Sequence, residues 1–231
     1  MSKHIAIIGG TSGIGRATVA QLQGEGHVVH AACRSPEKLA DLGVVAQAFD
    51  AAAPGPLAWP ERLDGFAYFP GTISLKPFHR LSAEDFARDL QVNLLGAVAA
   101  LQSALPALKA SGNASVVLFS TVAVAQGMPM HASIAAAKGA VEGLARSLAA
   151  EWAPAIRVNV IAPSLTDTPL AAALLNSDLK KEAAAKRHPL QQVGRSEDLA
   201  ALVAHLLSGH ARFMTGQVVR VDGGLSSVRT F

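Results

Sequence analysis

The chain has 231 residues, of which 50% are hydrophobic and 16% charged. This composition excludes a disordered or fibrous protein and allows one large domain or two small ones. The formal net charge is +3, but the basic residues are scattered and aromatic residues make up only 5%, so nucleic-acid binding is not expected.

Short runs of β-branched residues alternate with long alanine-rich stretches along the whole chain. The strands predicted from this pattern are 4–9, 27–33, 44–49, 65–69, 115–120, 156–162 and 217–223. The predicted helices are 16–25, a short helix from Pro36 with Ser35 as its N-cap, 83–110, 132–152, a polar helical region at 168–188, and 197–207 with Ser196 as its N-cap. The repeated β–α–β order predicts one doubly wound Rossmann-type α/β domain over 1–231, in which a parallel sheet of about seven strands carries helices on both faces.

Local signals add detail to the middle of the chain. Ser82, with Asp85 three residues later, predicts a capping box at the start of helix 83–110. Pro106 predicts a kink or a tightened turn near the end of the same helix. The segment 50–63 is rich in Pro and Ala and is predicted to be a loop with at most one helical turn.

A glycine-rich sequence, "GGTSGIG" (9–15), joins the first predicted strand to the first predicted helix. Its glycines permit a tight turn and a close approach of the backbone to a diphosphate, which then faces the positive end of the helix dipole. The spacing is G-x-x-x-G-x-G and differs from the G-x-G-x-x-G dinucleotide fingerprint, but its position inside a β–α–β unit is the one that fingerprint requires. The loop is therefore predicted to bind a dinucleotide.

The end of the second predicted strand favours NADP over NAD. An NAD-binding site has a carboxylate here that binds the ribose 2′-hydroxyl, whereas an arginine accommodates the 2′-phosphate of NADP. This chain has Arg34 and Ser35 after Cys33, and neither Asp nor Glu at the strand end. The Arg34 guanidinium offers a planar fork of donors and Ser35 adds a hydroxyl.

Several further motifs follow in the order found in the short-chain dehydrogenase/reductase family, which the sequence resembles nearly from end to end. "GGTSGIG" is similar to the family's TGxxxGIG, with Ile8 where threonine is usual, and "YFPG" (68–71) stands where the family has NNAG. "RVNVIAPSLTDT" (157–168) resembles RVNxVxPGxxxT, with Ser164 in place of glycine, and "MTGQVVRVDGG" (214–224) resembles TGQxxxVDGG. Asp50 is similar to the family's acidic residue that meets the adenine amino group. The resemblance implies cofactor contacts from Gly9, Thr11, Ser12, Gly13, Ile14, Gly15, Arg34, Ser35, Asp50, Gly71, Lys138, Pro163, Ser164, Thr166 and Thr168.

The catalytic residues that the resemblance implies are altered at one position. Within "QVNLLG" (91–96), Asn93 matches the family's structural and catalytic asparagine. "IAAAK" is similar to the family's Y-x-x-x-K, which puts Lys138 on the lysine and Ile134 on the tyrosine, and Thr121 falls on the catalytic serine. In the family the tyrosine protonates the alkoxide that hydride transfer creates, and isoleucine has no proton to donate. The resemblance is that of a divergent relative of the 3-oxoacyl-(acyl-carrier-protein) reductases.

Another residue is then needed to supply the proton. His131 lies seven residues before Lys138, nearly two helical turns, and an imidazole titrates in the range suited to proton transfer at neutral pH. The family's enoyl-thioester reductases carry a tyrosine close to this position, so His131 is a candidate acid; it is alternatively a loop histidine without a role. Tyr68 ends a strand at the same edge, although a buried sheet aromatic is the simpler interpretation.

Three functions remain open at this point. The first is an NADP-dependent reductase of a small carbonyl or 3-oxoacyl-type substrate with an atypical proton donor. The second is a reductase of a conjugated double bond, because an enolate is less demanding to protonate than an alkoxide. The third is a catalytically silent NADP-binding sensor or assembly subunit. No metal site is expected in any of them.

The expected setting is the cytoplasm. Cys33 is the single cysteine, which excludes an internal disulfide and suits a reducing compartment. The first apolar run is too short for a signal peptide, and no apolar stretch approaches the roughly 18 residues of a membrane span. The expected partners are a small-molecule substrate and, by analogy with the family, further copies of the chain in a dimer or tetramer.

Overall fold

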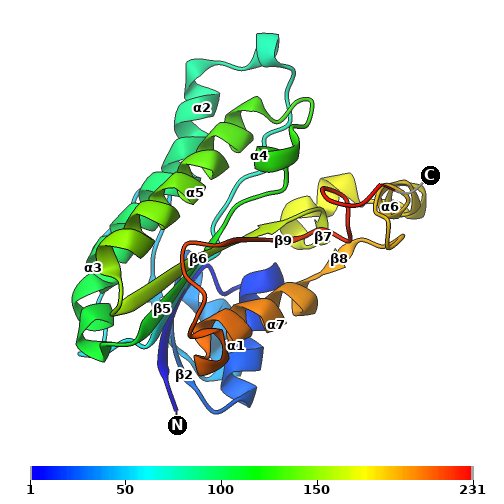
Figure 1. Cartoon of the computed structure of the whole chain (residues 1–231). Coiled ribbons are helices and arrows are strands. Elements are labelled where there is room, and N and C mark those ends of the chain that lie inside the picture. Colours follow the sequence, from blue (N-terminus) through cyan, green and yellow to red (C-terminus); the bar gives the residue numbers. More distant parts are fainter. Residues whose placement is uncertain (1, 230–231) are drawn as a thin grey trace.

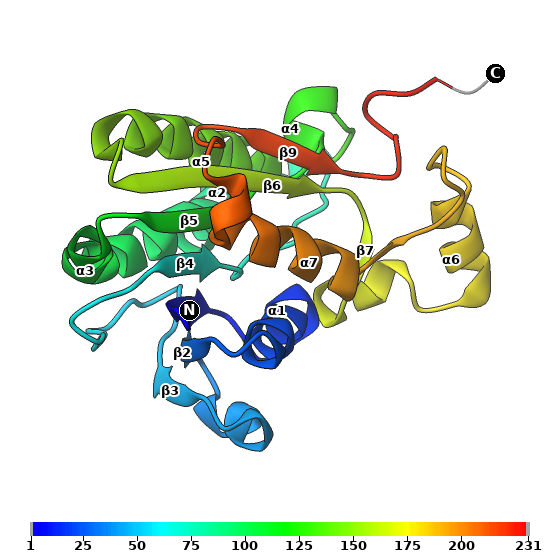
Figure 2. The same cartoon turned by 60° about the horizontal axis from the view of Figure 1, so that its bottom comes forward.

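The computed structural model, which describes residues 2–229, contains a seven-stranded sheet in which every neighbouring pair of strands is parallel. The strand order is β3-β2-β1-β4-β5-β6-β9 (Figure 2). The strands are β1 (His4–Ile8), β2 (Val28–Cys33), β3 (Val45–Ala48), β4 (Gly65–Tyr68), β5 (Ala114–Phe119), β6 (Ile156–Pro163) and β9 (Val218–Val221). The order reverses between β1 and β4, so the predicted doubly wound Rossmann-type domain is confirmed.

Helices cover both faces of this sheet (Figures 1 and 2). The helices of the first face are α2 (Ala83–Leu90), α3 (Gly96–Ser111) and α5 (Ala132–Trp152). The opposite face carries α1 (Gly13–Gly24) and α7 (Ser196–Leu207). The short helices α4 (Ala123–Gln126) and α6 (Asp178–Ala185) lie beyond the carboxyl ends of the strands, as does a second, two-stranded sheet of β7 (Thr166–Asp167) and β8 (Gly194–Arg195).

Alternation along β1 shows how the sequence builds a core on each face. Ala6 and Ile8 belong to the cluster under α3 and α5, whereas Ile5 and Ile7 belong to the cluster under α1 and α7. All four residues are fully buried, as expected for an inner strand of a parallel sheet covered on both sides. Because all strands are parallel, their carboxyl ends share one edge, and polar residues that follow them are brought together there.

The predicted continuous helix 83–110 is wrong in one respect. A π-helical turn, Gln91–Leu95, separates α2 from α3. Asn93 Nδ2 donates to Asp89 O at 2.8 Å, which is the carbonyl that the Asn93 backbone N–H would use in a regular α-helix. The side chain thus replaces a backbone donor, and the turn widens around it. The capping box of Ser82 and Asp85 is confirmed, with both reciprocal hydrogen bonds present.

Other differences are at element ends. Helix α1 begins at Gly13 rather than near Arg16, so the last glycines of the loop form its first turn. The polar region predicted as helical at 168–188 divides into a 3₁₀-helix, Pro169–Leu174, and α6. The helix predicted from Pro36 is also a 3₁₀-helix, Pro36–Leu42. Ser196 is the first residue of α7 instead of its N-cap, a position that Arg195 occupies.

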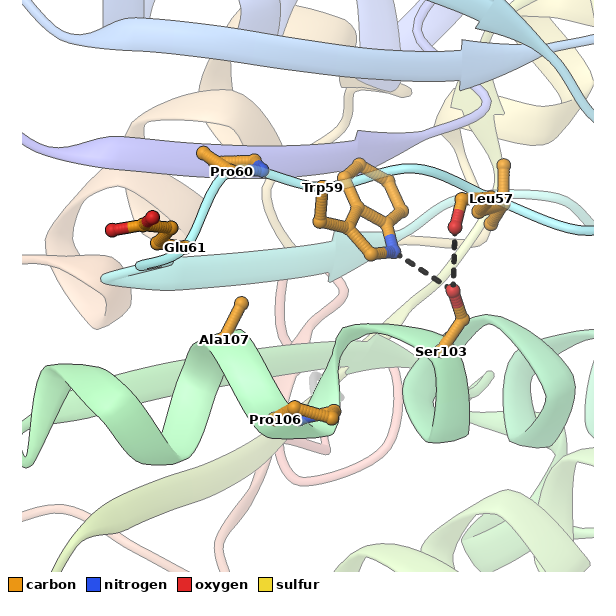
Figure 3. Close-up of a pocket in the computed structure, with 7 residues that line it drawn as sticks. All are labelled: Leu57, Trp59, Pro60, Glu61, Ser103, Pro106 and Ala107. Atoms are coloured by element: carbon orange, nitrogen blue, oxygen red, sulfur yellow. Dashed lines mark hydrogen bonds between the residues drawn. The ribbon is translucent and has the colours of Figure 1, made fainter.

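The segment 50–63 is a loop, as predicted, and Trp59 anchors it to α3 (Figure 3). Trp59 Nε1 donates to Ser103 Oγ at 3.0 Å, and Ser103 Oγ donates to the Leu57 carbonyl at 3.3 Å. A shallow hollow of about 340 Å³ lies beside Trp59. Pro106 lies at this hollow inside α3, and the helix continues past it to Ser111.

One helical stretch of the described residues, Ala83–Ser111, has the length and composition of a membrane-crossing helix. Core helices of globular proteins pass the same test. Ala97, Ala100, Leu101 and Ala104 of this stretch are buried against the sheet in the first core cluster, as a core helix requires.

Candidate functional site

A large cleft of about 1300 Å³ lies along the carboxyl edge of the sheet. It runs from the loop after β1 to α6 and the segment that follows it. The structure brings most of the predicted site residues together in its lining, namely Gly9, Thr11, Ser12, Gly13, Ile14, Gly15, Arg34, Asp50, Gly71, Thr121, His131, Lys138, Pro163, Ser164, Thr166 and Thr168. Ser35 and Asn93 are not part of this lining. Ser35 follows Arg34, which lines the cleft, and Asn93 faces Gly71, which also lines it.

The phosphate loop has the form that close approach to a diphosphate requires. A β-carbon on Gly15 would lie 2.2 Å from the Gly9 carbonyl oxygen, so only glycine permits this turn. The backbone φ of Gly9 is 86°, a left-handed value that glycine adopts without strain. Ser12 precedes α1 and its side chain makes no capping bond, so the first-turn N–H groups of α1 face the cleft without a side-chain cap. This geometry could hold an anion at the positive end of a helix.

The residues predicted for the adenosine half of the cofactor follow β2 and β3. Arg34 is exposed at the end of β2 and lines the cleft, whereas Ser35 is half-buried behind it. Asp50 Oδ1 accepts from the Ala52 backbone N–H at 2.9 Å, which fixes the carboxylate in a turn at the cleft margin. Arg16, the other nearby guanidinium, is paired with Asp41 outside the cleft lining.

Lys138 is a buried cation at the centre of the cleft. Its side chain is on α5, and Nζ donates to the Phe119 carbonyl at the end of β5 at 2.9 Å. Only 7% of the residue is exposed. Burial lowers the pKa of the Lys138 ammonium to about 8, against the opposing attraction of Asp89. Because Lys138 lines the cleft, its Nζ could bind ligand hydroxyls in place of the Phe119 carbonyl.

Asn93 and Gly71 complete the surroundings of this lysine. A β-carbon on Gly71 would lie 3.2 Å from Asn93 Oδ1 and 3.6 Å from Lys138 Nζ, so the absent side chain leaves both polar atoms facing one space. Asn93 Oδ1 is buried and has no hydrogen-bond partner among residues 2–229. A buried acceptor without a partner indicates a position for a water molecule or a ligand group.

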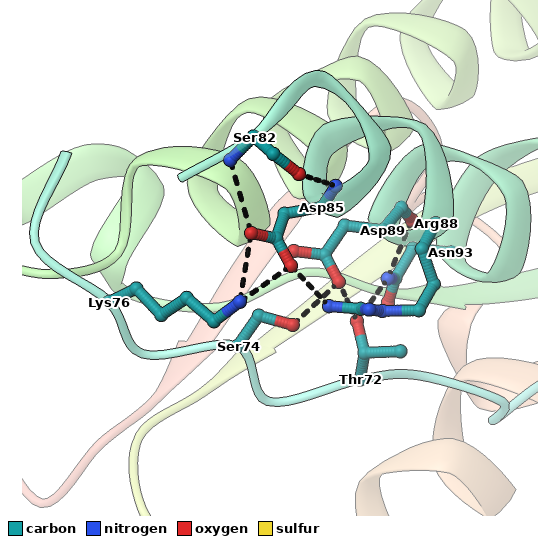
Figure 4. Close-up of polar contacts among 8 residues, drawn as sticks. All are labelled: Thr72, Ser74, Lys76, Ser82, Asp85, Arg88, Asp89 and Asn93. Atoms are coloured by element: carbon teal, nitrogen blue, oxygen red, sulfur yellow. Dashed lines mark hydrogen bonds and ion pairs between the residues drawn. The ribbon is translucent and has the colours of Figure 1, made fainter. Parts of the chain in front are cut away.

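The loop after β4 is fastened to α2 by a polar network that the sequence did not reveal (Figure 4). Thr72 and Ser74 donate to Asp89 Oδ1 at 2.7 and 2.8 Å, and Asn93 Nδ2 donates to Thr72 Oγ1 at 2.9 Å. Lys76 binds both oxygens of Asp85 at 2.8 Å. This ammonium, with the Ser82 N–H, holds the pKa of the Asp85 carboxyl down at about 2. The network fixes the cleft wall from which Gly71 and Thr72 face Lys138.

Thr121 supplies the hydroxyl at the end of β5. Its Oγ1 accepts from the Ala123 N–H at 3.3 Å, which uses a lone pair and leaves the hydroxyl proton for another acceptor. The neighbouring Ser120 hydroxyl is already used, since it donates to Glu142 Oε1 at 2.6 Å. Of the two, Thr121 is therefore the residue suited to donate into the cleft.

Ile134 and His131 lie on the α5 side of the cleft. Ile134 is 5% exposed and presents an apolar surface one turn before Lys138. His131 precedes the first turn of α5, where its Nδ1 donates to the Pro129 carbonyl at 2.7 Å. Tyr68 is a buried sheet aromatic whose hydroxyl donates to the Val92 carbonyl at 2.6 Å, and burial raises its pKa, so it is not a proton donor to the cleft.

The segment after β6 closes the cleft opposite α5. Thr168 lies over the phosphate loop, since a β-carbon on Gly13 would approach its side chain to 3.2 Å. Thr166 donates to the Ser164 carbonyl at 3.1 Å, and the Ser164 hydroxyl meets Nε2 of His188 at 2.8 Å. Sequence reasoning missed His188, because it lies 24 residues away in a segment without a recognisable motif.

Part of the remaining lining forms a mostly apolar end of the cleft, whereas Ala32, Cys33 and Phe49 lie at the ends of β2 and β3. Two exposed cations, Lys180 and Arg187, are at the margin of the apolar end, on and after α6. Its apolar residues are Ile73, Leu75, Met128, Met130, Leu170, Leu174 and Leu225. Among residues 2–229, no three His, Cys, Asp or Glu side chains are grouped as a metal would require.

The geometry of the phosphate loop and of Lys138 fits a nicotinamide dinucleotide. Gly15 leaves room at the helix end for a diphosphate, and Arg34 lies on the adenosine side of that loop. At the other end, Lys138 Nζ and Asn93 Oδ1 provide a buried donor and a buried acceptor for a ribose.

Comparisons with known proteins agree with this arrangement. The model of the family described as "Enoyl-(Acyl carrier protein) reductase" matches residues 9–226. A tropinone reductase homologue of Arabidopsis thaliana is 34% identical over 97% of this chain and 91% of its own. Among solved structures, a short-chain type dehydrogenase/reductase from Mycobacterium ulcerans has a TM-score of 0.88 at 28% identity, covering 99% of this chain and 92% of its own. The Pseudomonas aeruginosa RhlG/NADP active-site complex has a TM-score of 0.87 at 25% identity, covering 97% and 96%. The chain therefore belongs to the short-chain dehydrogenase/reductase family, whose members are oxidoreductases that use NAD(P).

Proposed function

We propose that the protein is an NADP-dependent reductase of a small carbonyl or 3-oxoacyl-type compound. The observation that carries this proposal is the convergence of the phosphate loop, the Thr121 hydroxyl and the buried Lys138 on one cleft. When bound, the reduced nicotinamide supplies a hydride. The apolar end of the cleft, with Lys180 and Arg187 at its margin, suits a substrate with an apolar body and an anionic group.

Each polar residue near the reacting end has a separate task. Thr121 donates a hydrogen bond from its hydroxyl to the substrate carbonyl oxygen and so polarises the carbonyl. Lys138 exchanges its bond with the Phe119 carbonyl for the ribose hydroxyls, and Asn93 Oδ1 supports the ammonium through a water molecule. The new alkoxide then receives a proton from His131 or from solvent, because Ile134 has none to donate.

The choice of NADP over NAD rests on Arg34. Its guanidinium is exposed at the end of β2, beside Ser35, and a charge-assisted pair with a 2′-phosphate suits this position. The RhlG structure with NADP is similar to this chain over nearly its whole length, which supports the same choice.

A second candidate is reduction of a double bond conjugated to a carbonyl. The apolar surface of Ile134 at the cleft wall favours it, because protonating an enolate carbon or oxygen demands less of a positioned acid than protonating an alkoxide. The description of the matching family model is that of an enoyl reductase. Comparing crotonyl-type with acetoacetyl-type thioesters as substrates separates the two candidates.

The test of the proposed function is oxidation of NADPH with a panel of ketones, 3-oxoacyl thioesters and enoyl thioesters, alongside direct measurement of NADPH binding. Turnover by the wild-type protein supports a reductase, and the substrate that is consumed identifies which kind. Binding without any turnover contradicts it. In that case the Ile134→Tyr variant is tested next. If this single substitution creates activity, the wild-type chain is a silent NADP-binding sensor or subunit.

The proposed setting is a cytoplasmic assembly of identical chains, a dimer or a tetramer. Family members commonly assemble through their long helices, and α3 and α5 are rich in small residues that allow such packing. Leu95, which is 49% exposed between α2 and α3, is an apolar side chain that such an assembly would cover. Sedimentation measurements on the purified protein determine its state.

A further inference from the structure

Two residues of the cleft, Ser164 and His188, form a polar pair that the reaction described above does not use. Ser164 Oγ and His188 Nε2 are 2.8 Å apart, and His188 Nδ1 is 2.9 Å from the Ala184 carbonyl oxygen. The histidine is 3% exposed, whereas Ser164 is half-buried at the cleft wall. Both residues line the cleft, where the imidazole contacts the serine hydroxyl.

The partners of the imidazole determine where its protons are. A carbonyl oxygen only accepts, so Nδ1 carries a hydrogen and donates it to Ala184 O. In neutral His188, Nε2 accepts the Ser164 hydroxyl proton. In protonated His188, Nε2 donates to Ser164 Oγ instead, and the serine proton is free to point into the cleft. Both ring nitrogens face oxygen atoms, so the same arrangement accommodates either charge state without movement of a side chain.

Ser164 is at the end of the strand adjacent to that of Thr121, the residue proposed to polarise the substrate. It follows β6, and Thr121 follows the neighbouring strand β5. The Val122 N–H donates to the Pro163 carbonyl at 3.2 Å, which joins the two segments one residue beyond Thr121 and one residue before Ser164. Two hydroxyls therefore stand at adjacent strand ends, on the carboxyl edge of the sheet where ligands bind.

Three elements hold the pair in place. The Ser164 N–H donates to the Val221 carbonyl at the end of β9 at 3.1 Å, and α6 supplies the Ala184 carbonyl. A β-carbon on Gly223 would lie 3.3 Å from the His188 β-carbon, so the chain after β9 packs directly against the histidine. Burying an imidazole costs free energy that an apolar residue at this position would avoid, which indicates a use for the polar pair beyond packing.

We propose that Ser164, recharged by His188, donates the proton that completes the reduction; this rests on the function proposed above. The substrate carbon receives a hydride, and the π electron pair of its carbonyl moves to oxygen. The Ser164 hydroxyl proton passes to that oxygen as the proton on His188 Nε2 passes to Ser164 Oγ. Neutral His188 is left with its proton on Nδ1. After the alcohol leaves, Nε2 takes up one proton from the solvent, which is the proton that the reduction consumes overall. Ser164 is then a catalytic residue, and His188 acts through it.

The kinetic test compares four single variants with the wild-type protein, using the substrate that the panel identifies. Ser164→Ala and His188→Gln are expected to lower kcat by about 10²–10⁴-fold, the range for loss of a positioned acid. Ser164→Thr keeps the hydroxyl and is expected to restore most of the rate. His210→Gln, an exposed histidine away from the cleft, is the matched control and keeps wild-type activity.

A spectroscopic measurement on the cofactor-free protein gives a second readout. In long-range proton–nitrogen NMR spectra, His188 is expected to carry hydrogen on Nδ1, and Ser164→Ala is expected to move the Nε2 resonance while leaving Nδ1 protonated. A His188 tautomer with hydrogen only on Nε2 would overturn the relay, because the ring would then lack its bond to Ala184.

The outcomes separate the two proposals. If the wild-type protein shows no turnover with any substrate, the proposed reductase function fails and the relay fails with it. If the wild-type protein turns over and Ser164→Ala retains its kcat, the relay alone is wrong. A loss of rate in His131→Gln with Ser164→Ala unaffected assigns the proton to His131 and also overturns the relay.

Discussion

Replacing the buried Lys138 by methionine should stabilise the protein while abolishing its affinity for the cofactor. Methionine keeps the length and most of the apolar volume of the lysine side chain but removes its charge. In the folded protein the Lys138 pKa is about 8, whereas the ordinary value is 10.5. Below pH 8 the folded state therefore contains a buried ammonium that the unfolded chain hydrates fully, and this lowers the stability of the native protein.

The size of the effect follows from these two pKa values. Each factor of ten in the acid dissociation constant is worth about 1.4 kcal/mol, so the charge destabilises the native state by about 3 kcal/mol at pH 7. The attraction of Asp89 is already included in this pKa. Losing the hydrogen bond from Nζ to the Phe119 carbonyl costs about 1 kcal/mol, which leaves a net gain of about 2 kcal/mol at pH 7.

The pH dependence has a definite sign. Between pH 8 and 10.5 the unfolded chain binds more protons at this site than the folded one, so this lysine makes wild-type stability rise with pH. At pH 10 its penalty falls to about 1 kcal/mol, and the advantage of Lys138→Met should disappear.

Urea unfolding followed by tryptophan fluorescence, at one protein concentration and at pH 7 and 10, measures the difference between the two proteins. Lys109→Met, an exposed lysine of α3, is the matched control and should change stability little at either pH. The reasoning is refuted if Lys138→Met is less stable than the wild-type protein at pH 7, or if the difference between them does not shrink with rising pH. NADPH binding to the variant is measured separately and should be lost.

Two further substitutions test the cofactor site. Gly15→Ala should lose NADPH binding, because its β-carbon would lie 2.2 Å from the Gly9 carbonyl oxygen; Gly55→Ala, where a β-carbon meets nothing within 4 Å, should bind normally in the same calorimetric titration. Arg34→Ala should weaken NADPH binding by about 10- to 100-fold, the loss of one charge-assisted bond, while leaving NADH binding nearly unchanged. Equal losses for both nucleotides would contradict the assignment of Arg34 to the 2′-phosphate.

The fold was predictable because the strands of a parallel sheet are short, apolar and evenly separated by helices. Helix α5 was predicted with both of its ends, from a long alanine-rich stretch that ends before Pro154. The π-helical turn at Asn93 was not predictable from periodicity, because it arises when a side chain replaces a backbone donor. The strands β7 and β8 have two residues each, too few to produce a pattern.

The site was predictable where its residues share a contiguous motif and not where packing alone joins them. The phosphate loop is predicted from closely spaced glycines between a strand and a helix, a pattern that can be seen in the sequence alone. Asp89 and His188 do not belong to any recognisable sequence motif. Each becomes visible only when the loop after β4 or the segment after β6 folds against it, as the bonds from Thr72 and the contact of Ser164 show.

The wide turn at Gln91–Leu95 has a consequence for how this region tolerates changes in length. An α-helix advances 100° per residue, so one residue more or fewer in the turn would rotate α2 by about that angle relative to α3. Asp85 and Asp89 would then point away from the loop after β4, although no side chain had been substituted. The turn therefore fixes the rotation of α2, which holds the cleft wall, relative to α3, which packs in the core.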